Sequence, residues 1–97
     1  MLVDPLGRML VLRDRTWQGH IARTHPELTD YRALVEKAVR EPDEIRMSLS
    51  DADCRIYFGL GPRPTVRMMV VGDVAQGIVK IAHLCARLSG GPTEWSK

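Results

Sequence analysis

The stretch Tyr31-Arg-Ala-Leu-Val-Glu-Lys-Ala-Val-Arg-Glu-Pro-Asp-Glu-Ile-Arg-Met-Ser-Leu-Ser50 decides the fold class, because its hydrophobic period changes from that of a helix to that of a strand. In its first half, apolar side chains recur at positions 31, 34, 35, 38 and 39. We expect a helix here, capped by Thr29 or Asp30 and ended by Pro42. After the proline, residues 44–50 alternate between apolar and polar side chains, which predicts a strand.

A second helix is expected upstream, over residues 14–25. Asp14 or Thr16 can cap its first turn. His25 precedes Pro26, and the residue before a proline is pushed towards extended backbone. The helix should therefore stop near Thr24 or His25.

Strand signals occupy most of the remaining chain. Residues 1–12 contain the turn sequence Asp4-Pro-Leu-Gly7, which predicts a short hairpin or an extended lead-in. Residues 54–58 and 66–71 are expected strands, separated by a loop rich in glycine and proline. Residues 77–88 fit either a helix or a buried strand. Two helices followed by three or four strands predict an α+β domain, with the helices packed on one face of the sheet.

Length and composition indicate one globular domain spanning residues 1–97. The chain is 44% hydrophobic and 27% charged, as in ordinary folded proteins. No apolar run approaches the roughly 20 residues that cross a bilayer, and the N-terminus lacks the features of a secretory signal. We therefore expect a cytoplasmic protein without membrane contact. Cys54 and Cys85 stand far apart without further zinc ligands, which predicts two reduced, buried thiols.

Arginine dominates the positive charge, with eleven arginines against three lysines. The planar guanidinium suits bidentate phosphate contacts, although a GC-rich genome would produce the same bias. Four arginines fall in the middle of the chain, where a hairpin is expected, and they form either a face for an anionic ligand or the solvated side of the sheet. These are Arg46, Arg55, Arg63 and Arg67.

Two of the chain's three histidines stand close together in Trp17-Gln-Gly-His20-Ile-Ala-Arg-Thr-His25-Pro-Glu27. On an uninterrupted helix, His20 and His25 would lie about 140° apart around the axis. The break at Pro26 frees His25 to turn, so the two rings can converge. The alternative is that each is a hydrogen-bonded structural residue.

Paired histidines suit phosphodiester transfer, which needs a base for the ribose 2′-hydroxyl and an acid for the leaving 5′-oxygen. A cation must also hold the phosphate, and Arg23, Arg55 and Lys80 are candidates. Tyr57 is a candidate proton donor or stacking platform for a base, or else a half-buried sheet residue. The spacing of His20, His25 and Glu27 matches no zinc motif, so no metal is expected.

The order of these motifs resembles a known family. The segments Trp17-x-x-His20-Ile-x-x-x-His25-Pro-Glu27 and Glu41-Pro-Asp-Glu-Ile45, with a helix between them, are similar to the phage-associated barnase–EndoU–colicin–RelE-like nucleases. The similarity extends from about Leu10 to about Trp95. It implies two N-terminal helices packed on a four-stranded antiparallel sheet, a RelE/barnase-like fold, and metal-independent ribonuclease activity.

By position, the resemblance assigns His20, His25 and Glu27 to the family's two histidines and its acidic residue. The sequence Ile81-Ala82-His83 stands at the place of the motif on the last strand, which favours a strand over residues 77–88. Ile81 replaces the family's threonine. Either His83 or Lys80 takes over the role of the missing hydroxyl, or the enzyme is weakened.

Two functional hypotheses follow. The first is a small ribonuclease, as the toxin of a toxin–antitoxin pair or a phage-related effector, with RNA and a cognate antitoxin protein as partners and no cofactor. The second is a catalytically degenerate module that binds RNA or protein. The expected catalytic residues are His20, His25, Glu27, Lys80 and His83. The expected substrate contacts are Arg23, Arg46, Arg55, Tyr57 and Arg67.

Overall fold

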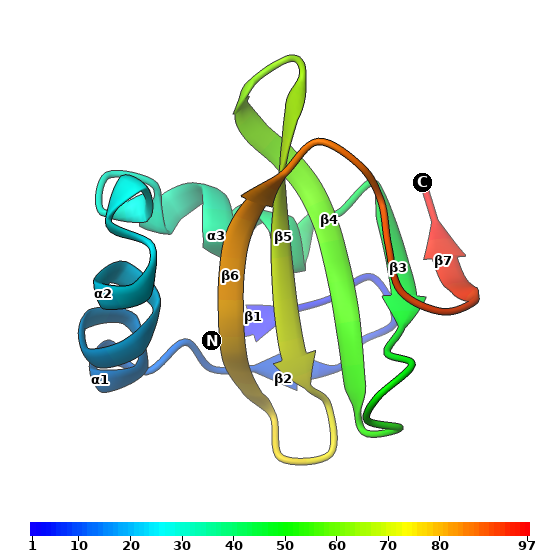
Figure 1. The fold of residues 1–97 in the computed structure, drawn as a ribbon. Coiled ribbons are helices and arrows are strands. Elements are labelled where there is room, and N and C mark those ends of the chain that lie inside the picture. The colour runs from blue at the N-terminus through cyan, green and yellow to red at the C-terminus, as the bar shows by residue number, and fades with distance from the viewer.

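A five-stranded antiparallel sheet in the order β6-β5-β4-β3-β7 forms the centre of the computed structural model, which describes residues 1–97 (Figure 1). The expected α+β class is confirmed. The strands of the sheet are β3 (Glu44–Met47), β4 (Cys54–Arg63), β5 (Val66–Asp73), β6 (Ile78–Cys85) and β7 (Thr93–Ser96). A separate two-stranded hairpin consists of β1 (Leu2–Val3) and β2 (Met9–Leu10). The helical elements are α1 (Asp14–Thr16), the π-helical segment Trp17–Ile21, α2 (Ala22–Thr24), the 3₁₀ turn Pro26–Leu28 and α3 (Arg32–Arg40).

The sheet corrects the expectation of four strands. The fifth strand, β7, pairs antiparallel with β3 beyond the glycine- and proline-rich segment at residues 89–92. The expected loop at residues 59–64 is also wrong, because β4 continues to Arg63 and pairs with β5 through a local irregularity after Leu60. Residues 78–85 form a strand, which resolves the ambiguity of that segment.

The helices differ from the expected pair. Residues 14–24 are helical and stop before His25, as expected, but α1 and α2 are three-residue turns on either side of the π-helical segment. No side chain caps this region, so the expected caps Asp14 and Thr16 are not used. Gly19 inside it lowers helical propensity further, which is consistent with an irregular helix.

Helix α3 is the one helix of regular length, and it ends before the buried Pro42. Its first turn begins at Tyr31 without a side-chain cap, so the expected caps Thr29 and Asp30 are also wrong. The Thr29 hydroxyl instead donates to the carbonyl of Pro26 at 2.7 Å, within the preceding 3₁₀ turn. The buried residues of α3 are Val35, Ala38 and Val39, as its spacing predicts.

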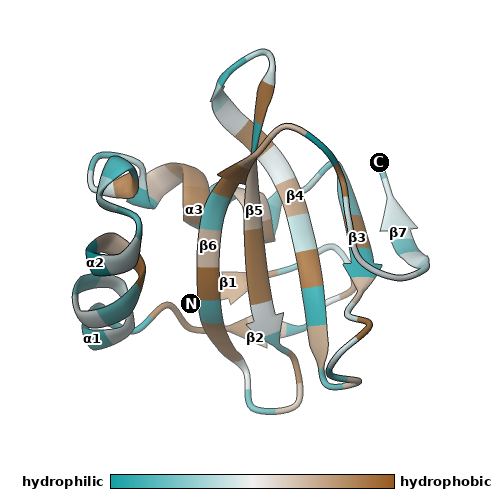
Figure 2. Ribbon diagram, in the orientation of Figure 1, coloured by the Kyte–Doolittle hydropathy of each residue, from teal (hydrophilic) through white to brown (hydrophobic).

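Helix α3 and the β1–β2 hairpin together cover one face of the sheet, which we call the core face. A Cβ atom on Gly59 of β4 would lie 2.7 Å from the Ala38 Cα, so the helix and the strand are in direct contact. A Cβ on Gly72 of β5 would lie 2.9 Å from a methyl group of Leu10 in the hairpin. Figure 2 shows the hydrophobic residues concentrated on the central strands, while α1 and α2 are mainly hydrophilic.

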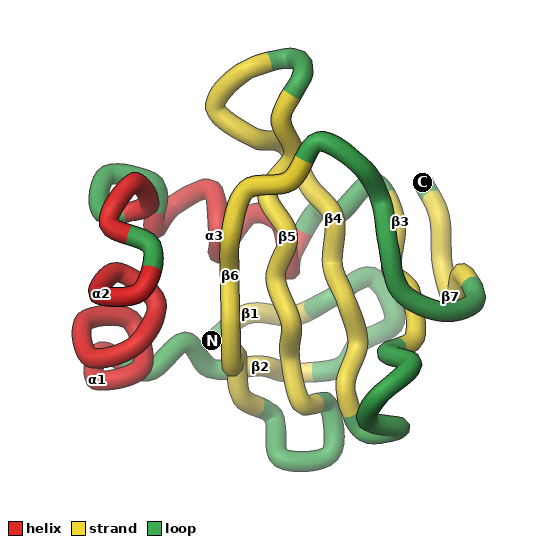
Figure 3. The backbone as a smooth tube through the Cα atoms, in the orientation of Figure 1, coloured by secondary structure: helices red, strands yellow, loops and turns green.

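The opposite side of the sheet, the front face, is only partly covered. The segment between β6 and β7 crosses it (Figure 3), and a Cβ on Gly90 would lie 2.6 Å from the Ile56 side chain. The Arg46 guanidinium lies 6.0 Å from the ring centre of Phe58. Ile56 and Phe58 are therefore buried although they face away from the helices. The part of the front face formed by β5 and β6 stays accessible.

Both cysteines are free thiols, as expected, with Cys54 buried and Cys85 partly buried. Burial raises the pKa of each thiol. None of the helices has the length and the hydropathy that a membrane span requires.

Candidate functional site

The structure brings His25 and His83 together from distant parts of the chain. Their ring centres lie 5.6 Å apart, with the ring planes inclined at 35°. His25 stands at the end of α2 with φ −126° and ψ 76°, a non-helical conformation that the following Pro26 favours. His83 projects from β6, the strand at the edge of the sheet next to α2 (Figure 1). Both rings are partly exposed.

Each ring has one nitrogen engaged and one free. The Nδ1 atom of His25 lies 3.2 Å from the Glu27 carboxylate. The Nδ1 atom of His83 lies 3.0 Å from the carbonyl oxygen of Leu84. Since both partners are acceptors, the hydrogen belongs on Nδ1 in each ring, and Nε2 of the neutral form carries the lone pair. The arrangement therefore presents two imidazoles that can exchange protons through Nε2.

His20 does not take part in this pair. It is exposed on the π-helical segment, and its side chain makes no hydrogen bond, ion pair or ring contact. The turn at Pro26 carries His25 towards β6, and no ring contact joins it to His20. The expected convergence of His20 and His25 is therefore wrong, and the ring next to His25 is that of His83.

Apolar side chains of β5 and β6 lie beside His83 on the same face of the sheet. Cross-strand neighbours share one face of a sheet, and His83 is opposite Met69, while Ile81 is opposite Val71. Ile81 is 38% exposed, so this position is open to solvent. These residues lie on the front face, because the alternate residues Val70 and Ala82 belong to the core.

Four of the expected cations lie at the surface. Arg67 is 45% exposed on the front face and binds Asp43 at 2.6 Å. Arg46 binds Glu44, which lowers the pKa of that carboxyl group. Arg23 and Lys80 are exposed and have no carboxylate partner. Arg23 lies on α2 two residues before His25, and Lys80 lies on β6 three residues before His83.

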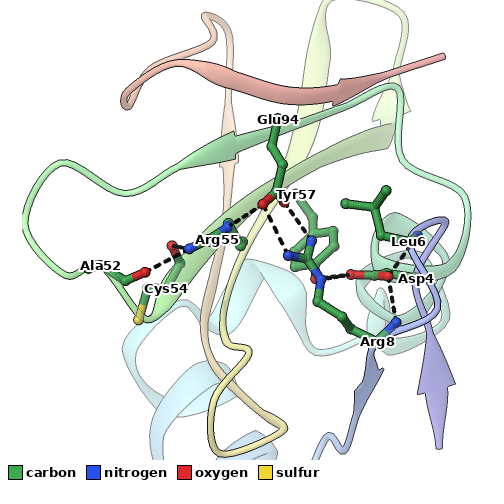
Figure 4. Close-up of polar contacts among 8 residues, drawn as sticks. All are labelled: Asp4, Leu6, Arg8, Ala52, Cys54, Arg55, Tyr57 and Glu94. Atoms are coloured by element: carbon green, nitrogen blue, oxygen red, sulfur yellow. Dashed lines mark hydrogen bonds and ion pairs between the residues drawn. The ribbon is translucent and has the colours of Figure 1, made fainter.

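Two expected substrate contacts, Arg55 and Tyr57, are corrected by the structure. Tyr57 is fully buried on the core face, so no base can stack on it. Its hydroxyl donates to the Asp4 carboxylate at 2.6 Å. Arg55 is also directed to this side, where its Nε donates to Glu94 at 2.8 Å (Figure 4). Neither side chain can reach a ligand on the front face.

These two residues belong to a polar network that joins both ends of the chain. Arg8 donates through Nε to Asp4 at 2.8 Å and through Nη2 to Glu94 at 2.6 Å (Figure 4). Asp4 is fully buried in its side chain and also accepts from the backbone N–H groups of Leu6 and Arg8. The network therefore ties the β1–β2 hairpin to β7.

The network changes the pKa values of its members. Burial favours the neutral form of Asp4, but the hydrogen bonds from Tyr57 and Arg8 outweigh it, so the pKa of Asp4 is lowered. Hydrogen bonds from Arg8 and Arg55 likewise lower the pKa of Glu94. Burial and the hydrogen bond to Asp4 raise the pKa of Tyr57, so this hydroxyl stays protonated.

A cleft of about 300 Å³ lies at the other edge of the sheet, between α3, β7 and the turn of the hairpin. The sequence offered no motif for it, because its lining comes from three separate segments. Those residues are Pro5, Arg40, Glu41, Pro42, Trp95 and Lys97. The cleft contains none of the histidines, so it is separate from the His25–His83 pair.

Nowhere in the chain do three or more histidine, cysteine, aspartate or glutamate side chains gather as a metal site would require. The candidate site consists of His25, Glu27 and His83; Lys80 lies on the same strand as His83, and Arg67 lies on the neighbouring strand β5. Comparison with known proteins returned no match to a protein family, to a curated protein or to a solved structure.

Proposed function

We propose that this protein is a small ribonuclease in which His25 and His83 act as the acid and the base. The observation that carries the proposal is the contact of the two rings at 5.6 Å, each with its Nδ1 held by an acceptor. A pair of imidazoles with free Nε2 atoms suits a reaction that removes one proton and delivers another.

In the proposed reaction, neutral His83 takes the proton of a ribose 2′-hydroxyl through Nε2. The 2′-oxygen then forms a bond to phosphorus while the bond from phosphorus to the 5′-oxygen breaks. Protonated His25 gives its Nε2 proton to the leaving 5′-oxygen, so the products are a 2′,3′-cyclic phosphate and a 5′-hydroxyl. Glu27 lies beside His25 alone, which is why we assign the protonated role to that ring.

Exposed cations around the pair can hold the phosphate as charge builds on it. Lys80 and Arg23 have no competing carboxylate, so they are free to bind a phosphate oxygen. Arg67 would have to exchange Asp43 for the ligand, which is feasible because both side chains are more than 40% exposed. Arg46 is placed further away on β3 and is proposed only as a contact to flanking RNA.

The proposal extends to the family that the sequence resembles. In this proposal the protein is a RelE/barnase-like nuclease that acts on RNA in the cytoplasm. Its role is that of a toxin or a phage-related effector, and an antitoxin is its protein partner. The order of helix, histidine pair and antiparallel sheet supports this reading. The fifth strand does not weaken it, since β7 is added at the edge farthest from His83.

A second candidate is a degenerate module that binds RNA without cleaving it. Ile81 favours this alternative, because an exposed apolar side chain stands two residues from His83 where the family carries a hydroxyl. Such a module would bind RNA with strong salt dependence and no turnover.

The test is cleavage of a labelled RNA by purified protein in EDTA. We expect a bell-shaped pH profile, and His25→Ala and His83→Ala should each lower the rate by at least about 100-fold. A substrate with 2′-deoxyribose at the scissile position should stay intact. His20→Ala is the control for a surface histidine and should retain activity.

Each alternative has its own outcome. Loss of cleavage in His20→Ala with full activity in His83→Ala would refute the pairing proposed here. Salt-sensitive binding without cleavage by the unmodified protein would establish the degenerate module. Cleavage that is unchanged in both His25→Ala and His83→Ala would refute the acid–base assignment altogether.

A further inference from the structure

The outer face of the β1–β2 hairpin carries exposed apolar side chains. Strand alternation directs Leu2 and Leu10 into the core, while Val3 and Met9, which are paired across the strands, face outward. Five of the eight exposed large hydrophobic residues of the protein lie in this segment. They are Met1 (81% exposed), Val3 (47%), Leu6 (46%), Met9 (58%) and Val11 (44%), which we call the hairpin patch.

The polar network described above keeps charge out of the hairpin patch. The two charged residues of the hairpin are Asp4 and Arg8, and both are turned inward. Asp4 is fully buried in its side chain, and Arg8 is directed to Asp4 and Glu94. The side chains of the hairpin patch are therefore apolar across two paired strands, and an apolar surface of this kind is often a binding site.

We propose that the hairpin patch is the interface of a homodimer, in which the hairpins of two copies pack face to face around a two-fold axis. The five residues together expose at most roughly 500 Å², backbone atoms included, which lies within the range for the largest apolar patch of a monomer. Two such patches bury roughly 1,000 Å² before any rim is counted, which reaches the lower limit for a specific interface.

The geometry of the hairpin patch is suited to a copy of itself. In a two-fold contact the same surface meets itself, so it must be self-complementary. A charged patch would face its own sign across the axis, whereas Val3 and Met9 can pack against Met9 and Val3 of the other copy. The net charge of +2 adds little repulsion.

Dimerisation through this surface would leave the candidate active site open. The hairpin lies on the core side of the sheet, where Leu10 contacts Gly72 of β5. His83 belongs to the front face, opposite Met69. The proposal does not rest on the ribonuclease assignment, since its evidence and its test concern the hairpin alone.

The test is the molar mass of the purified protein, measured by sedimentation and by light scattering from about 1 to 500 µM. We expect a reversible monomer–dimer equilibrium with a dissociation constant on the order of micromolar, in line with an interface at the small end of the range. Because the contact is apolar, about 0.5 M added salt should not dissociate the dimer. At about 0.1 M salt the Debye length is already only ~10 Å, so a dimer held by exposed charges would weaken at 0.5 M.

Val3→Glu and Met9→Glu should each raise the dissociation constant at least ~100-fold, since each buries two like charges at the axis. Leu49→Glu is the matched control, because Leu49 is 79% exposed outside the hairpin, and this variant should dimerise normally. Val3→Thr and Met9→Gln provide milder changes if a glutamate variant fails to fold, and they should weaken the dimer at least 10-fold. A protein that is monomeric at 500 µM, or a dimer that Val3→Thr and Met9→Gln leave unchanged, would overturn the proposal.

Discussion

The hydroxyl of Tyr57 offers a direct measure of how much the buried network contributes to stability. Tyr57→Phe removes the 2.6 Å hydrogen bond to Asp4 and leaves the packing of the ring in place. A hydrogen bond to a charged acceptor contributes about 1.5–3 kcal/mol. Asp4 keeps three donors, Arg8 Nε and two backbone N–H groups, so the carboxylate is not left without partners. We therefore expect a loss of about 2 kcal/mol, which lowers Tm by roughly 10 °C in a domain of this size.

The loss should depend on pH, because Asp4 has a lowered pKa in the folded protein. A lowered carboxyl pKa stabilises the fold above the ordinary pKa, and this contribution disappears as the pH falls through the folded value. Tyr57 donates one of the hydrogen bonds that lower this pKa. The difference in unfolding free energy between the unmodified protein and Tyr57→Phe should thus have its largest value at about pH 7. It should become smaller below about pH 4, which is near the ordinary aspartate pKa.

Urea denaturation followed by circular dichroism at a series of pH values measures both effects. Tyr31→Phe is the matched control, since Tyr31 is partly exposed and its hydroxyl makes no hydrogen bond. It should change the unfolding free energy by less than about 0.5 kcal/mol. A loss below about 0.5 kcal/mol in Tyr57→Phe, or one that stays constant down to acid pH, would refute this reasoning.

Other substitutions test packing and the front face. Gly59→Ala should destabilise by about 1–3 kcal/mol, because its Cβ would lie 2.7 Å from the Cα of Ala38; a neutral result in thermal unfolding would contradict the close approach. Gly19→Ala has open space and should raise stability by up to about 1 kcal/mol in the same assay. Ile81→Thr introduces a hydroxyl at an exposed position of the front face, so under the proposed function we expect faster RNA cleavage than in Ile81→Val. Equal rates in the two variants would show that this hydroxyl is not required.

The parts of the fold that could be predicted are those with a local period. Helix α3 follows from its apolar stripe, and β3 and β5 follow from alternation or apolar runs. Strand β7 could not be predicted, since it is four residues long and follows Gly90-Gly91-Pro92. Its partner β3 lies about 50 residues earlier in the chain, and no local sequence pattern predicts a pairing between such distant segments.

The sequence indicates that histidines form the candidate site, but it does not indicate which two histidines lie next to each other. His25 stands out in the sequence because Pro26 interrupts the helix beside it, whereas His83 is indicated by the position of Ile81-Ala82-His83 on the last strand of the resembled family. Their contact depends on how α2 lies along β6, which no spacing in the sequence encodes. Arg55 and Tyr57 were misplaced because β4 is buried on both faces, so its side chains show no alternation that distinguishes front from core.

The bond between Arg8 and Glu94 joins residues 86 positions apart in the chain. Such a contact can form only after nearly the whole domain has left the ribosome, and its loop-closure entropy is among the largest that the fold must overcome. Until then, the edge of β3 that pairs with β7 is unpaired, and an unpaired edge is prone to pair with another chain. We therefore expect the closing of β7 onto β3 to be a late event in folding, and the interval before it to be the time when the nascent chain is most exposed to aggregation.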